Sequence, residues 1–197
     1  MVGPMSGIGA PLGVIRHFTQ HHGEFTLKLR EKKLSFTGDD YEITTPDGRP
    51  FLIMKGKVFS LRNRKLLCDA QGQPILNIRD QIFTLFKQFR IYAGETEEPE
   101  ICHVKRHFSM LGDKLSVHFQ NFDGREVELL VKGSILDRHA EIYAGDIVVA
   151  RIHRKFMNVG EVFFDQQTYY LTVGPGVDAA MMAAVCVCLD EVANEKN

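Results

Sequence analysis

The sequence predicts an all-β domain that closes into a barrel around one buried C-terminal helix. Two patterns support this prediction. Short runs of alternating apolar and polar residues, separated by turn sequences, fill the chain from about Glu24 to Val173, and an apolar segment of helix-forming residues follows them. A closed barrel around that segment pairs every strand and buries the helix.

The strand prediction is strongest in the segments 25–30, 115–120, 126–132 and 168–173, where apolar and polar residues alternate. A period of two places one side-chain set on a buried face and the other on a polar face. Turn sequences rich in Gly, Asp and Pro separate the strands at short intervals, which is typical of a sandwich or barrel. Residues 95–100 are acidic, contain Pro99, and are expected to form a solvated connection.

One turn sequence occurs twice. Asp47-Gly48-Arg49 recurs as Asp123-Gly124-Arg125, and each copy leads through a strand pattern to a Lys-Gly pair. The repeat indicates two similar β halves within one domain, with chance similarity between turns as the alternative.

The last apolar segment, Val177–Leu189, is predicted to be a helix because it is rich in Ala and Met and follows the breaker Gly174-Pro175-Gly176. It is apolar on every face except at Asp178, so it must be buried all round or lie in lipid. Its 13 residues span roughly 20 Å, short of the hydrocarbon core of about 30 Å, which favours burial inside the barrel. We expect a central helix over about 177–193, with these structural residues: Val177, Ala180, Met181, Ala184, Val185 and Cys188.

The domain organisation follows from composition. Residues 1–22, with a start rich in Gly and Pro, are expected to be a flexible N-terminal tail, and residues 23–197 the barrel domain. The start lacks the pattern of a signal peptide, and the four cysteines form no Cys-x-x-Cys pair, so we expect a cytoplasmic protein with reduced thiols. A net charge of −1 argues against a protein built to bind nucleic acid. The cysteines are Cys68, Cys102, Cys186 and Cys188.

Two segments carry a family likeness. Leu171–Val192, which includes the predicted helix, resembles the C-terminus of LURP-one-related proteins, and Phe59–Ile75 is similar to that family's early signature. The resemblance implies a closed twelve-stranded, tubby-like β-barrel around a hydrophobic helix, a fold shared with tubby-like domains and phospholipid scramblases. Members of this family have no established biochemical activity, so the resemblance implies the fold more than the function. No enzymatic activity and no cofactor are expected. The scramblase calcium segment is not matched, because Asp165–Tyr170 holds one carboxylate, and the scramblase cysteine cluster is absent.

The candidate site for lipid or phosphate binding is a basic cluster near one predicted hairpin end. Its Lys and Arg side chains suit a phosphate, and tubby domains bind phosphoinositides through basic side chains on the barrel. The alternative is a solvated edge that discourages strand pairing. A second basic set, Lys28, Arg30, Lys32 and Lys33, is interpreted as an ordinary polar strand face. The candidate site comprises Lys55, Lys57, Arg62, Arg64 and Lys65.

The sequence contains no pattern that supports a catalytic or metal-binding site. His103 and His107 share a strand face, but roughly 13 Å separates them, too far to ligate one metal ion. No serine lies in a nucleophile-elbow sequence, so no catalytic residue and no metal site are predicted. Core packing is the expected role of Phe83, Phe86 and Phe89.

The sequence therefore predicts a non-enzymatic binding module, monomeric and without cofactor. We expect it to dock on anionic membrane phospholipids or phosphoinositides, as a cytoplasmic protein peripheral to the membrane. One alternative is a protein-interaction or regulatory scaffold, linked to stress or defence by the resemblance, with a protein partner and no lipid. The other is a scramblase-like lipid transporter. No nucleic-acid partner and no transmembrane span are expected.

Overall fold

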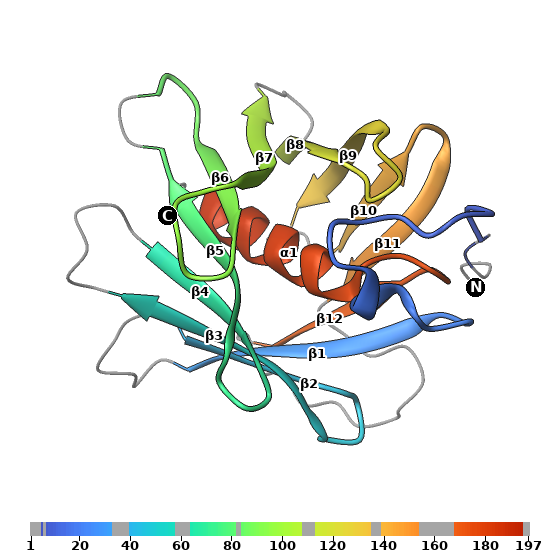
Figure 1. Cartoon of the computed structure of the whole chain (residues 1–197), viewed down its shortest axis with the longest axis horizontal. Helices are drawn as coiled ribbons and strands as arrows, with labels where there is room; N and C mark the ends of the chain where they lie inside the picture. Colours follow the sequence, from blue (N-terminus) through green and yellow to red (C-terminus); the bar gives the residue numbers. More distant parts are fainter. Residues whose placement is uncertain are drawn as a thin grey trace.

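The computed structural model describes Met5 and residues 7–32, 40–57, 64–81, 84–107, 113–134, 139–153 and 168–194. These residues form twelve strands, one short 3-10 helix before them and one α-helix after them (Figure 1). The elements are η1 (Arg16–Thr19), β1 (Phe25–Lys32), β2 (Asp40–Thr44), β3 (Pro50–Lys57), β4 (Arg64–Asp69), β5 (Pro74–Asp80), β6 (Gln88–Ala93), β7 (Glu100–His107), β8 (Asp113–Gln120), β9 (Glu126–Ser134), β10 (His139–Ala144), β11 (Ile147–His153), β12 (Thr168–Val173) and α1 (Ala179–Asn194).

The strands form a closed antiparallel barrel in which each strand pairs with its neighbours in sequence. The barrel closes where β1 pairs with β12, with Leu27 opposite Leu171. Closure leaves no sheet edge exposed for pairing with another chain. The predicted closed twelve-stranded barrel is therefore confirmed.

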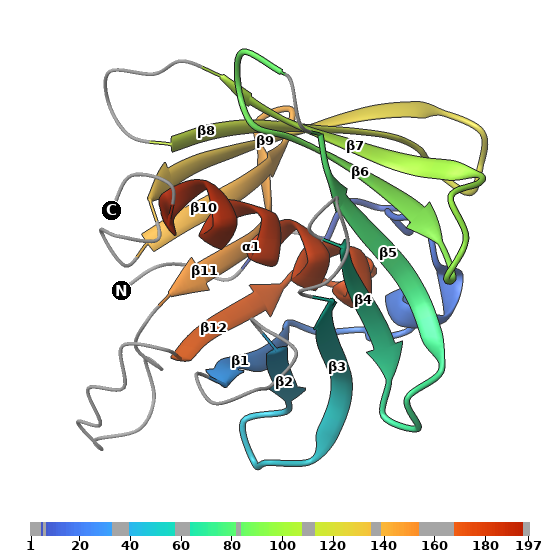
Figure 2. The same cartoon turned by 90° about the vertical axis from the view of Figure 1, so that its left-hand side faces the viewer.

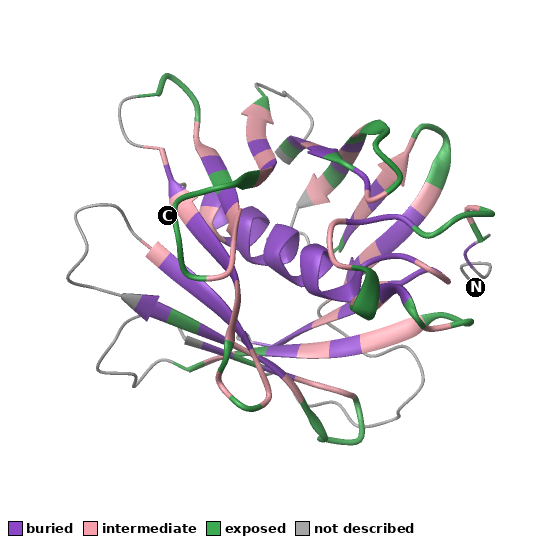
Figure 3. Cartoon of the chain, in the orientation of Figure 1, coloured by how far each residue is buried: buried purple, intermediate pink, exposed green. Residues whose placement is uncertain are grey.

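Helix α1 runs through the interior of the barrel (Figures 1 and 2). Its residues are coloured buried along almost the whole of its described length (Figure 3). The residues predicted to be structural are at most 1 % exposed, and of these Val177 lies just before the helix, which begins two residues later than predicted. Its alanines let the surrounding strands approach closely. Within the described residues, no helix is long and apolar enough to cross a membrane.

The core also tests the predictions for phenylalanine and cysteine. Phe89 is buried at 2 % exposure, as predicted, but Phe86 is 42 % exposed, so core packing was wrong for it. Phe83 lies outside the described residues. All four cysteines are free thiols and buried, and burial raises the pKa of the thiols of Cys102 and Cys186.

The N-terminal end of α1 is closed by the segment before β1. The carboxylate of Asp178 accepts hydrogen bonds from the backbone N–H groups of Val14 at 3.1 Å, Ile15 at 2.7 Å and Met181 at 3.0 Å. The last of these caps the helix, which starts at Ala179. Burial raises the pKa of Asp178, and the N–H donors oppose that rise.

Close packing fixes this segment against the helix. Gly13 has a φ of 149°, and a Cβ there would lie 2.1 Å from the Cβ of Asp178, so only glycine fits. Leu12 is buried and bridges to Val177. Residues 12–15 and His21, which belong to the expected N-terminal tail, thus make defined contacts with the start of the helix.

The C-terminal end of α1 is held by side chains from the barrel wall. The hydroxyls of Tyr41 and Tyr169 both donate to the carboxylate of Asp190, the second at 2.6 Å. Burial, followed by the nearby Asp190, raises the pKa of Tyr41 well above its usual value. Beside them, Lys65 forms an ion pair with Glu191 at 2.6 Å. Asp190 and Glu191, the first polar residues after the apolar part of α1, are thus each paired with side chains of the barrel wall.

The repeated turn sequence occupies equivalent hairpins. One copy joins β2 to β3 and the other joins β8 to β9, six strands later in the barrel. In both, the guanidinium Nε of the arginine donates to the aspartate at 2.8 Å, and the central glycine has a positive φ, 87° for Gly48 and 85° for Gly124. The structure thus places the two copies at matching positions of the two barrel halves.

Candidate functional site: basic residues on the barrel wall

The predicted basic cluster is divided between the two sides of the barrel wall. Lys55 is exposed on the outer face, and Arg64 lies on the same face. Lys65 is 6 % exposed and points inward to Glu191. Lys57 pairs with Arg64 in the ladder, but its side chain, like all of Arg62, lies outside the described residues. The described members therefore do not form one surface.

A row of arginines instead crosses the outer face of three neighbouring strands. Arg64 on β4 lies directly opposite Arg79 on β5, which lies directly opposite Arg90 on β6. We call these three residues the arginine row. Like charges directly opposite one another destabilise a sheet, so this arrangement requires compensating charge.

That charge comes from the acidic connection, residues 95–100, which joins β6 to β7 and includes the first residue of β7. Its glutamates form ion pairs with the row: Glu95 with Arg64 at 3.4 Å, Glu97 with Arg79 at 2.5 Å, and Glu100 with Arg90 at 3.0 Å. The side chains of Arg64 and Arg79 are only 15 % and 11 % exposed beneath it. The connection is exposed along residues 95–100, as expected of a solvated segment, and its inner side also covers the wall.

A buried amide fastens this connection to the wall. Asn77, which is fully buried, donates from its side chain to the carbonyl oxygens of Glu95 at 3.3 Å and Thr96 at 2.8 Å. Its side-chain oxygen accepts from the Nε of Arg64 at 3.2 Å. The amide therefore links the acidic connection to the arginine row.

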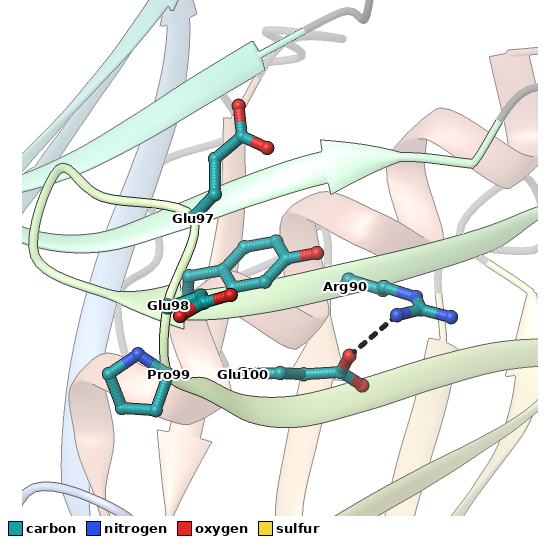
Figure 4. Close-up of a pocket in the computed structure, with 6 residues that line it drawn as sticks. Arg90, Glu97, Glu98, Pro99 and Glu100 are labelled. Atoms are coloured by element: carbon teal, nitrogen blue, oxygen red, sulfur yellow. Dashed lines mark hydrogen bonds and ion pairs between the residues drawn. The ribbon is translucent and has the colours of Figure 1, made fainter.

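A hollow of about 610 Å³ lies between this connection and the strands (Figure 4). It is lined by Arg90, Tyr92 and residues 97–100. Arg90 is turned toward Glu100 within it, and its guanidinium charge is taken up by that ion pair. Three glutamates and one arginine give the lining an acidic balance, which disfavours an anionic ligand.

A second basic surface lies on β7, β8 and β9. His107, Lys114 and Lys132 lie directly opposite one another on these three strands. Lys105 lies two residues before His107 and shares its outer face. We call Lys105, His107, Lys114 and Lys132 the lysine patch.

The lysine patch has no compensating acid among the described side chains. None of its three lysines forms an ion pair with a described carboxylate. Glu141 lies opposite Lys132 in the ladder but pairs with Arg151 at 3.2 Å. Lys132 lies over the ring of Tyr143, 4.6 Å from its centroid. Positive charge on this surface is therefore left facing solvent.

A buried serine contacts two imidazoles, one in the lysine patch and one beside it. The hydroxyl of Ser116, which is fully buried, lies 2.7 Å from Nε2 of His107 and 2.9 Å from Nε2 of His118. Glu128 approaches the same Nε2 of His118 at 3.7 Å, so it does not orient the ring from its far nitrogen as a catalytic triad requires. This geometry is that of an anchored surface, not of a nucleophile open to a substrate.

The histidines of β7 do not converge on one metal ion. His103 contacts Gln88 at 3.1 Å, whereas His107 contacts Ser116. Over the part of the chain that the structure describes, no three His, Cys, Asp or Glu side chains come together as a metal site. Asp165 lies outside that part.

Sequence reasoning missed the lysine patch, although part of its signal was visible. Alternation places Lys105 and His107 on one strand face and Lys114 opposite the apolar face of β8. The register that brings these strands together cannot be read from one strand at a time.

Comparisons with known proteins agree with this architecture. The LURP-one-related family profile matches residues 25–190. Among curated proteins from Arabidopsis thaliana, protein LURP-one-related 15 is 32 % identical over 175 residues, covering 86 % of this chain and 80 % of that protein. Protein LURP1 is 30 % identical over 172 residues, covering 84 % and 83 %. An X-ray structure of an Arabidopsis thaliana protein superposes with a TM-score of 0.63 at 25 % identity, covering 91 % of this chain and 99 % of that one. The chain therefore belongs to the LURP-one-related family.

Proposed function

We propose that this protein is a non-enzymatic binding module that docks on anionic phospholipid or phosphoinositide headgroups through the lysine patch. The observation that carries the proposal is the absence of any described carboxylate partner for Lys105, Lys114 and Lys132. Lys114 and Lys132 are exposed and Lys105 is half-buried. Such ammonium groups gain the most from a phosphate, because no internal ion pair has to be broken first.

The patch also has a suitable geometry for phosphate. Directly opposite residues in an antiparallel ladder have Cα atoms about 4.5–5.5 Å apart, so the side chains of Lys114 and Lys132 can reach one phosphate group. Ser116 holds His107 beside them. The arginine row is less suited to this role, because its guanidinium groups are engaged by the acidic connection.

The burial of α1 favours docking over the scramblase-like alternative. A scramblase-like transporter would need this helix in the bilayer, which requires opening a barrel in which Met182 and Cys188 are fully buried. A scaffold without lipid binding predicts no effect of lipid charge at all. Both alternatives are therefore separable from docking by experiment.

Vesicle flotation tests the proposal. We expect the protein to bind phosphatidylcholine vesicles that contain phosphatidylserine or phosphatidylinositol bisphosphate, and to be released by salt. In the Lys114→Glu/Lys132→Glu variant, partitioning should fall about twentyfold or more, since each lysine near an anionic surface contributes about 1 kcal/mol.

The matched control is Lys28→Glu/Lys55→Glu, which changes net charge equally on β1 and β3. It should bind nearly as well as the unmodified chain. Loss of binding in the control alone would move the site to the cluster around Lys55. Equal, salt-independent background binding to charged and neutral vesicles would refute lipid docking and favour the protein scaffold.

A further inference from the structure

Two apolar side chains project into solvent from the connection between β5 and β6. Leu85 is 91 % exposed and Phe86 is 42 % exposed. Figure 3 colours this described stretch as exposed where it projects from the barrel end. Exposed single apolar residues are common, but an adjacent Leu-Phe pair at a tip is a feature of binding surfaces.

The tip has a defined base. The hydroxyl of Thr84 lies 3.0 Å from the carbonyl oxygen of Gln81 and 2.8 Å from that of Phe86, so it bonds across the turn. Lys87 forms an ion pair with Asp80 at 2.7 Å, and both side chains are nearly buried. The base is thus fixed while the two apolar side chains remain outside.

The tip lies beside the lysine patch. Gln88, two residues after Phe86, pairs directly with Lys105 of that patch. The backbone N–H of Arg106 donates to the carbonyl oxygen of Lys87 at 3.0 Å. In Figure 2 the strands β6, β7 and β8, which carry the tip and part of the patch, lie next to one another. Apolar and unpaired positive groups therefore adjoin at one end of the barrel.

We propose that Leu85 and Phe86 insert into the interfacial region of an anionic bilayer while the lysine patch contacts its headgroups. This inference rests on the proposed function and adds the orientation of docking. An anionic membrane presents negative charge above an apolar layer, and membrane-surface proteins bind it with the same combination of cations and apolar side chains. Two side chains alone bury far less than the roughly 1,200 Å² of a stable protein interface, so a second copy of the chain is the poorer occupant.

The chain contains no tryptophan, so one introduced tryptophan reports on its own site alone. In the Phe86→Trp variant, emission should shift to the blue on addition of phosphatidylserine vesicles, and lipids brominated on their acyl chains should quench it. The matched control is Ile147→Trp, because Ile147 is 40 % exposed and starts β11 at the opposite end of the barrel. Its emission should not change.

Replacing the two apolar side chains of the tip gives a second readout, which is vesicle partitioning. Leu85→Ser/Phe86→Ser should reduce partitioning to the same vesicles about tenfold, because the transfer of apolar area to the interface is lost. Binding should then become more sensitive to salt, since only charge remains. Ile147→Ser should bind like the unmodified chain.

The experiment distinguishes a failure of membrane insertion from a failure of headgroup docking. If Phe86→Trp binds vesicles in a charge-dependent way without a blue shift, insertion is overturned while headgroup docking stands. If it does not bind vesicles at all, the proposed function fails with it. A blue shift without vesicles, together with a doubled mass by light scattering, would assign the tip to a second copy and overturn insertion.

Discussion

The two basic surfaces of the barrel wall differ in whether nearby carboxylates compensate their positive charge. In the arginine row, Arg64, Arg79 and Arg90 face one another across β4, β5 and β6, and each is matched by a glutamate of the acidic connection. In the lysine patch, the same cross-strand geometry on β7, β8 and β9 has no such cover within the described chain. The number of cations alone therefore does not distinguish the two surfaces. The position of the compensating acids does.

Charge reversal should separate the two surfaces most strongly. Arg79 is 11 % exposed and lies against Glu97, so Arg79→Glu places two carboxylates together in a covered site. We expect it to lower the free energy of unfolding by about 3 kcal/mol. Lys114→Glu, on the exposed patch, should change it by less than about 0.5 kcal/mol. Urea unfolding measures both, and equal losses would contradict the distinction.

Removal of the acidic cover should have an intermediate effect. Replacing Glu95, Glu97 and Glu100 by glutamine leaves the arginine row uncompensated, at an expected cost of about 1–2 kcal/mol in unfolding free energy. The same variant should bind anionic vesicles more tightly, because the row then resembles the lysine patch. Glu98→Gln is the control, since Glu98 lies in the same connection with no ion pair to a described residue. If the control matched the triple variant, the ion pairs would not be the cause.

The smallest effect should be a pH dependence at His103, which joins the two surfaces. His103 lies opposite Arg90 on one side and His118 on the other. Burial, followed by the positive charge of Lys105, lowers its pKa below 6.5. The unfolded chain then binds the proton more readily, so stability should be lost as pH falls below about 6.5.

His153, whose pKa is also lowered by burial, should contribute with the same sign. His103→Gln should therefore flatten the fall in unfolding free energy between neutral pH and pH 5 without abolishing it. Replacement of the exposed His22 by glutamine should leave the profile unchanged. A steeper profile in His103→Gln would show that protonation stabilises this site.

The helix and the barrel could be predicted because their signals are local. Every face of Val177–Leu189 is apolar apart from Asp178, and that pattern fits only a fully enclosed helix of this length. Strand alternation and Gly-Asp turns likewise act over a few residues. The enclosing strands then follow from the need to bury the helix.

The candidate site could not be predicted in the same way. Strand β4 carries no alternation, because the acidic connection covers its outer face while the helix covers its inner one, so Leu66 and Leu67 are both buried. Without alternation, the sequence pattern does not indicate that the side chain of Arg64 points outward and that of Lys65 inward. The long-range contacts of Leu12 and Asp178 also left no local pattern, so the N-terminal segment was interpreted as a tail.

The most direct test is to locate phosphate binding on the wall by NMR, with a short-chain, water-soluble phosphatidylinositol bisphosphate below its micelle concentration. Our account predicts backbone shift changes centred on Lys105, Ser116 and Lys132, with residues 64, 79 and 90 unaffected. Shift changes centred on the arginine row, or none at either surface at millimolar ligand, would contradict it.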